Sequence, residues 1–80
     1  MHFLYASKLD VTRKLVATFD SEQQLLAYVG WATLQKKPDG TSKFEQGSAL
    51  AGYQRWEPSV VPLTTDDPQD VVHNPSPSML

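Results

Sequence analysis

The pattern of hydrophobic and polar positions changes its period at Asp20, and this change predicts a strand followed closely by a helix. Over residues 13–19 the side chains alternate, which is typical of a strand with one buried face. One face is predicted to carry Leu15, Ala17 and Phe19, and the other Lys14, Val16 and Thr18. After Ser21 the hydrophobic residues recur with a period of about 3.6, as in an amphipathic helix.

The helix is predicted to span about residues 21–36. Ser21 and Gln24 fit a capping box, in which the two side chains satisfy backbone N–H groups that have no partner within the helix. Glu22 lies in the first turn, where the helix dipole favours negative charge. The Lys-Lys-Pro sequence of residues 36–38 is typical of a helix C-terminus. These signals define both ends of the predicted helix.

The two sides of this helix predict two different contacts. One arc is expected to pack on a sheet, and it consists of Leu25, Leu26, Tyr28, Val29 and Ala32. The opposite side carries Ala27, Trp31 and Leu34, and a Trp and a Leu are unusual on a solvent-exposed helix face. Either the C-terminal part of the chain covers this side or a protein partner does. Because Trp is enriched at interface hot spots and a symmetric dimer buries the same patch twice, a homodimer interface is one hypothesis.

Two further strands complete the predicted fold. Residues 2–7 alternate and are close enough to residues 13–19 for an antiparallel hairpin. A third strand is predicted over residues 52–57, or alternatively over 49–57, and Pro58 is expected to limit further pairing. The sequence therefore predicts an α+β fold: a small antiparallel ββαβ sheet of about three strands, with one helix on one face. Residues 1–58 form the predicted domain, and residues 59–80 form a Pro-rich acidic extension that packs on it or on a second protomer.

Composition limits how a chain of 80 residues can be stabilised. The chain has no cysteine, so disulfides and thiolate metal sites are excluded, and oligomerisation is the remaining common means of stabilising so small a core. All seven Lys and Arg side chains lie in residues 1–58, whereas the extension contains three Asp and no base. The first ten residues do not resemble a signal peptide, and the longest apolar run is shorter than the roughly 20 residues of a membrane span. A soluble cytoplasmic protein with no membrane partner is expected.

No group of residues in the sequence predicts catalysis, so a non-enzymatic protein without cofactor or metal is expected. The two histidines, His2 and His73, lie near opposite ends of the chain. His73 follows Asp70 by three residues, but in a Pro-rich segment a solvated pair is the simpler interpretation. Asp66 and Asp67 precede a proline in an ordinary turn sequence. The main hypothesis is therefore an interaction module that binds itself or another protein.

Nucleic-acid binding is the alternative hypothesis. Proteins that bind single strands combine aromatic platforms with a basic groove. The residues that would serve this function are Arg13, Lys14, Tyr53, Arg55 and Trp56. Aromatic side chains on a small sheet more often fill its buried face, and the net charge of −2 gives no overall basic field.

Overall fold

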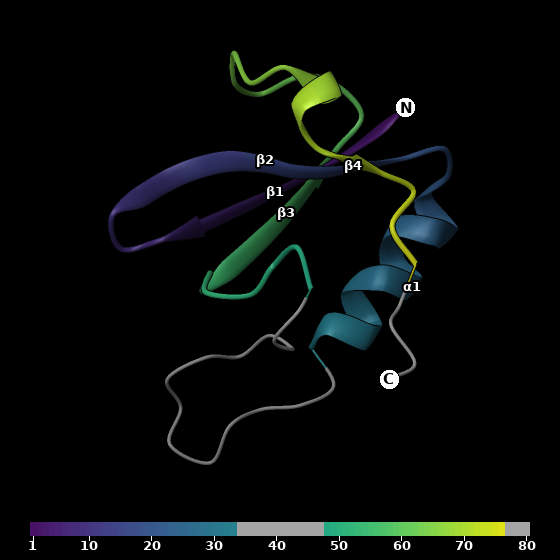
Figure 1. Ribbon diagram of the computed structural model, residues 1–80, viewed down its shortest axis with the longest axis horizontal. Coiled ribbons are helices and arrows are strands. Elements are labelled where there is room, and N and C mark those ends of the chain that lie inside the picture. The colour runs from purple at the N-terminus through teal and green to yellow at the C-terminus, as the bar shows by residue number, and fades with distance from the viewer. Residues whose placement is uncertain (34–47, 77–80) are drawn as a thin grey trace.

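The chain folds into a four-stranded sheet with one helix across one face (Figure 1). The computed structural model describes residues 1–33 and 48–76. Its elements are β1 (His2–Lys8), β2 (Val11–Phe19), α1 (Glu22–Ala32), β3 (Arg55–Ser59), a short 3-10 helix (Pro68–Asp70) and β4 (Val72–His73). The predicted α+β class, with one helix packed on a small sheet, is confirmed.

The sheet has the strand order β3-β1-β2-β4 and is mixed. The predicted antiparallel hairpin is present as β1 and β2, and β3 pairs antiparallel with the other edge of β1. The expectation of three antiparallel strands misses β4, which comes from the extension and pairs parallel with β2. A strand of two residues is too short to show a periodic pattern. A parallel pair requires a long crossover connection, and the segment between β2 and β4, which includes α1 and β3, provides one.

A β-bulge in β2 corrects the predicted faces of that strand. Leu4 pairs with Ala17 and Tyr5 pairs with Leu15, so Val16 is an extra residue without a partner of its own in β1. Because side chains alternate along a strand, one extra residue moves every later side chain to the other face. Leu15 therefore lies on the face opposite Ala17, although the sequence alternation places them together.

Helix α1 begins where the capping signal predicts it. Ser21 is the N-cap, and its hydroxyl oxygen accepts a hydrogen bond from the Gln24 N–H at 3.2 Å. The Ser21 hydroxyl also donates to Gln24 Oε1 at 3.3 Å, so the Gln24 side chain contacts the cap through the hydroxyl and not through the Ser21 N–H that a full capping box uses. The helix ends at Ala32 with Thr33 as its C-cap. Residues 34–36 of the predicted helix lie outside the described residues.

The helix side of the sheet holds the larger core. Its buried residues are Leu4, Ala6, Ala17, Phe19, Leu25, Tyr28, Val29, Ala32 and Leu50. Leu26 was predicted to join this core, but it is 47% exposed. The helix meets the sheet along Leu25, Val29 and Ala32. Val29 and Ala32 follow Leu25 by four and seven residues, so the three lie on one side of the helix, and Leu26 lies beside this line.

The opposite face of the sheet is covered by the extension. Phe3, Tyr5 and Leu15 are buried there, and Leu63 and Val71 pack against them. The Leu63 N–H donates to Tyr5 Oη at 2.8 Å. In Figure 1 the sheet lies between α1 and the segment that joins β3 to β4. The sheet is therefore covered from both sides, with the extension as the second layer.

The third strand starts later and ends later than predicted. The chain makes overlapping turns at residues 48–53, where Ala51 N–H donates to Ser48 O and Tyr53 N–H donates to Leu50 O. Strand β3 then runs through Pro58, which pairs with Leu4. Pro58 is tolerated because β3 is an edge strand, where an N–H on the outer side has no partner in the sheet.

Candidate functional site

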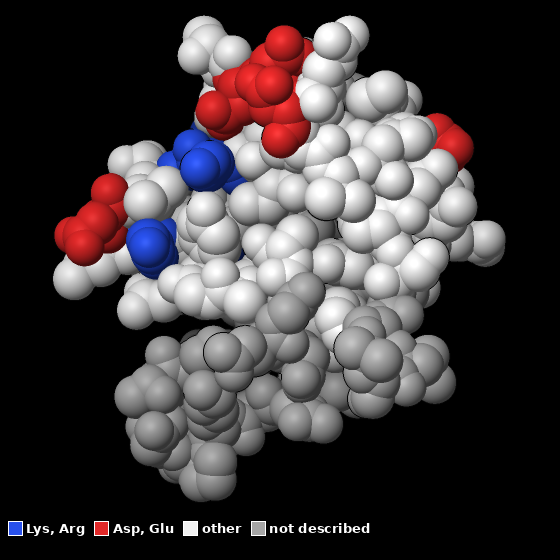
Figure 2. All heavy atoms as spheres, viewed as in Figure 1, with Lys and Arg blue, Asp and Glu red and all other residues white. Residues whose placement is uncertain are grey.

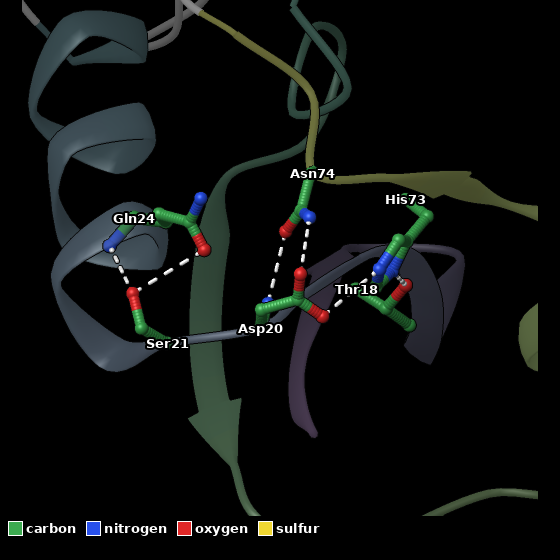
Figure 3. Close-up of polar contacts among 6 residues, drawn as sticks. All are labelled: Thr18, Asp20, Ser21, Gln24, His73 and Asn74. Carbon is green, nitrogen blue, oxygen red and sulfur yellow. Dashed lines mark hydrogen bonds and ion pairs between the residues drawn. The ribbon is translucent and has the colours of Figure 1, made fainter.

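A cluster of polar side chains lies at the junction of β2, α1 and β4 (Figure 3). His73 of β4 contacts residues at the end of β2 that lie more than fifty positions earlier in the sequence. Its Nδ1 lies 2.8 Å from Thr18 Oγ1, and its Nε2 lies 3.1 Å from Asp20 Oδ1. With the ring proton on Nε2, the Thr18 hydroxyl donates to Nδ1 and the imidazole donates to the Asp20 carboxylate. The partner of His73 is therefore Asp20 and not Asp70, which the sequence places three residues away.

Asn74 completes this cluster from a left-handed backbone conformation with φ of 51°. Its side-chain Oδ1 accepts from the Asp20 N–H at 2.9 Å, and its Nδ2 donates to Asp20 Oδ2 at 2.7 Å. Its own N–H donates to the Thr18 carbonyl at 2.7 Å. The hydrogen bond from Asn74, with help from His73, holds the pKa of the Asp20 carboxyl below its ordinary value.

The residue types in this cluster are those of a hydroxyl–imidazole–carboxylate triad, but the geometry serves a structural role. A nucleophilic hydroxyl must be reached by substrate. Thr18 is only 1% exposed, because it lies on an inner strand that pairs with β1 on one side and with β4 on the other. The cluster joins β4 to the end of β2 and so fixes the position of the extension.

Asp66 and Asp67 are likewise explained by local structure. Asp66 Oδ2 accepts from the Thr64 hydroxyl at 2.6 Å and from the Leu15 N–H at 3.1 Å, which together lower the pKa of Asp66. Asp67 caps the 3-10 helix by accepting from the Gln69 N–H at 2.9 Å. Within residues 1–33 and 48–76, no group of three or more acidic or histidine side chains is placed to hold a metal ion.

An apolar groove lies between the start of α1 and the end of β3. It has a volume of about 390 Å³ and is lined by His2, Glu22, Leu25, Leu26, Pro58, Ser59 and Val60. Leu26 is 47% exposed and Val60 is 67% exposed, and Val61 beside it is also exposed. Sequence reasoning missed this groove, since it placed Leu26 in the core and Val60 in the Pro-rich extension. We call it the Leu26 groove.

The three residues predicted as a protein interface do not share one environment. Ala27 is exposed and follows Leu26 on the helix. Trp31 is half-buried against the helix-side core, and its ring lies 5.4 Å from the ring of Tyr28. Leu34 lies outside the described residues. Packing within the chain therefore accounts for much of the burial of Trp31, and the large apolar side chain that this helix exposes is Leu26.

The residues predicted to bind nucleic acid are divided between the two faces of the sheet. Tyr53 and Trp56 pack partly against the helix-side core. Arg55 precedes Trp56 on β3, so its side chain points to the other face. Arg13 donates to Glu57 Oε1 from Nη2 at 3.0 Å and from Nε at 3.2 Å.

Lys14, the fifth of these residues, is exposed on β2. Its positive charge contributes to lowering the pKa of Asp66. Lys14 neighbours Arg13 along β2, so the two side chains point to opposite faces of the strand. Of the five predicted residues, Arg13, Arg55 and Trp56 line one concavity, whereas Lys14 and Tyr53 do not line it.

Comparison with known proteins found no protein-family model, no curated protein and no solved structure with significant similarity to this chain. Among the described residues, no helix combines the length and the apolar composition that a membrane crossing requires.

Proposed function

We propose that the protein is a small non-enzymatic interaction module that forms a homodimer through the Leu26 groove. The observation that carries this proposal is the exposure of Leu26 and Val60 on the walls of one apolar concavity. Exposed apolar residues that line a common groove are typical of protein–protein contacts. A second copy of the chain would cover the groove and would also add buried surface to a small core. A cytoplasmic location is part of the proposal, and the absence of cysteine fits it.

The charges around the groove favour a second copy as the occupant. The ionisable side chains that line it are Glu22 and His2, so the groove is neither strongly acidic nor strongly basic. A two-fold axis places each residue of one protomer opposite a residue of the other. Glu22 of one protomer can then lie opposite His2 of its partner, and like charges need not meet.

The exposed side of α1 allows such a contact to be close. Ala27 is exposed beside Leu26, and Gly30 one turn further is also exposed. Among the described residues, a Cβ atom built on Gly30 would meet no atom within 4 Å apart from its chain neighbours and the backbone of its own helix. Small residues beside Leu26 let a partner helix approach without removing large side chains.

Association by strand addition is less favourable than association through the groove. Pro58 lies in the edge strand β3 and has no N–H to donate to an added strand. The other edge strand, β4, has only two residues. Both edges of the sheet are therefore poor templates for pairing with another chain.

The test compares the oligomeric mass of three chains at high micromolar concentration by sedimentation equilibrium. The wild-type chain is expected to give twice the monomer mass of 8.9 kDa. Leu26→Glu places a carboxylate in the contact, which should raise the dissociation constant about 100-fold or more. Leu9→Glu is the matched control, since Leu9 is 91% exposed in the β1–β2 turn, away from α1.

Three results are informative. Dimers of the wild type and of Leu9→Glu, together with a monomeric Leu26→Glu that keeps the wild-type circular dichroism spectrum, support the proposal. A monomeric wild type across the whole concentration range overturns it. Equal weakening by both substitutions also overturns it, because added negative charge and not the groove would then set the association.

A further inference from the structure

The extension covers only part of the sheet face on which it packs. The uncovered end of that face carries several basic side chains. Strand pairing places Ser7 beside Arg55 and Tyr5 beside Glu57. Residues 60–71 cover Tyr5, but the sheet continues beyond it toward the β1–β2 turn. In Figure 2 the acidic side chains of the extension gather at the top of the view, basic side chains lie beside them toward this turn, and a further acidic group lies at the turn itself.

Two adjoining concavities occupy this open end. One has a volume of about 330 Å³ and the other about 300 Å³, and both are lined by Ser7, Thr12 and Arg55. Arg13 and Glu57 also line the first, and Lys8 lines the second. The lining therefore contains three cationic side chains and one carboxylate, in a chain whose net charge is −2. We call these two concavities the Arg55 site.

The two arginines of the Arg55 site are in different states. Glu57 holds the Arg13 guanidinium through Nε and Nη2, which fixes the orientation of the group and leaves its other N–H donors available. Among the residues that the structure describes, no carboxylate pairs with Arg55, and its side chain is exposed. One oriented guanidinium and one unpaired guanidinium beside two hydroxyl groups form a set of donors for an oxyanion.

We propose that the Arg55 site binds a phosphate group carried by a small molecule. The volumes of the two concavities, taken together, suit a ligand of that size. Arg55 and Arg13 bind the phosphate oxygens, and the hydroxyls of Ser7 and Thr12 add hydrogen bonds. A nucleic-acid strand is the less favourable ligand because, of the two aromatic residues predicted to stack on bases, only Trp56 lines the first concavity, and both Tyr53 and Trp56 pack partly against the helix-side core.

The test uses the full-length ¹⁵N-labelled chain, followed by NMR during titration with inorganic phosphate and pyrophosphate. The largest shifts are expected at the amides of Ser7 and Thr12 and at the Arg55 Nε–H. Arg55→Gln should weaken pyrophosphate binding about fivefold to tenfold, as expected for the loss of a charge-assisted contact. Lys14→Gln is the matched control because it removes the same charge outside the lining of the site.

Glu57→Gln removes the negative charge of the site but keeps a side-chain oxygen that can accept from Arg13, so it should strengthen pyrophosphate binding. Equal weakening by Arg55→Gln and Lys14→Gln overturns the proposal, since net charge and not the site would then determine affinity. The absence of shifts at Ser7, Thr12 and Arg55 overturns it as well. A parallel titration uses an oligothymidine strand. If it binds more than about tenfold tighter per phosphate than pyrophosphate and quenches Trp fluorescence, the ligand is nucleic acid and the proposal fails.

Discussion

Removal of residues 60–80 is expected to unfold the protein. The extension covers three side chains of the second sheet face, Phe3, Tyr5 and Leu15, each of which is less than 9% exposed. Exposure of a large buried side chain costs about 1.5–3 kcal/mol, so the three together lose roughly 5–9 kcal/mol. A domain of 80 residues has a total free energy of unfolding of about 4–12 kcal/mol at the usual value per residue. The loss is as large as the whole stability.

Circular dichroism and urea denaturation measure this outcome directly. The full-length chain is expected to unfold in one cooperative transition, and the shortened chain is expected to show no transition. The shortened chain also loses the hydrogen bonds that Leu15, Tyr5 and Thr18 make with the extension. A shortened chain that unfolds cooperatively, with a midpoint close to that of the full chain, would refute the conclusion that the extension is part of the core.

A pair of single substitutions examines the same contact without removing chain. Leu63→Ala reduces the cover over Tyr5 and should lower the free energy of unfolding by about 1–2 kcal/mol, since Leu63 is only partly buried. Val61→Ala is the matched control, because Val61 is exposed in the same segment and should change stability by less than about 0.5 kcal/mol. Equal effects of the two substitutions would contradict packing of Leu63 on the sheet.

Three further predictions concern other contacts. Asn74→Ala should destabilise the protein by about 1–3 kcal/mol in urea denaturation, and Asn74→Gly by less, because glycine accepts the positive φ but cannot bond Asp20. The pKa of Asp20 is lowered in the folded state, so its contribution to stability is present at pH above the ordinary value of 3.8 and is lost as pH falls through the folded pKa. With Asp20→Asn, the free energy of unfolding should therefore decrease less as the pH falls into the acid range. Leu50→Ala should cost about 2–5 kcal/mol, because Leu50 is fully buried in the helix-side core.

Each of these predictions has a result that contradicts it. Asn74→Gly as destabilising as Asn74→Ala would assign the effect to the side chain alone and not to the backbone conformation. If Asp20→Asn leaves the decrease of the free energy of unfolding at acid pH unchanged, the ionised Asp20 carboxylate does not stabilise the fold. A thermal shift of only a few degrees for Leu50→Ala would mean that residues 48–51 pack loosely, since about 1 kcal/mol already moves the midpoint by about 4–8 °C in a domain of this size.

The local signals in the sequence predicted the elements that depend on local interactions. The period change at Asp20 and the capping box at Ser21 place the start of the helix correctly, because both arise from contacts within a few residues. The hairpin of β1 and β2 is likewise a contact between neighbouring segments. These elements decide the α+β class of the fold.

The errors arise where distant parts of the chain decide the outcome. The bulge at Val16 reverses the face of Leu15, and no turn or glycine signal near it announces the extra residue. The contacts of His73 and Asn74 with the end of β2 join residues more than fifty positions apart, so sequence spacing paired His73 with Asp70. Leu26 is exposed because a narrow sheet accepts only part of a broad apolar arc.

The Leu26 groove and the Arg55 site could not be predicted from the sequence for the same reason. Each groups residues from the first strand, the second strand or the helix with residues of β3 or the segment after it. Sequence reasoning did select Arg13 and Arg55 as basic residues on strands. It also selected Tyr53 and Trp56, whose rings the fold uses largely for packing.

The parallel pairing of β2 with β4 has a consequence for synthesis on the ribosome. The hairpin and α1 are made first, but the second face of the sheet stays uncovered until the residues up to Val71 have been added. During that interval Phe3, Tyr5 and Leu15 are exposed to the surrounding solution, and the nascent chain has its greatest tendency to aggregate. Pairing of β4 with β2 joins segments more than fifty residues apart, so we expect this step to follow formation of the local hairpin and helix.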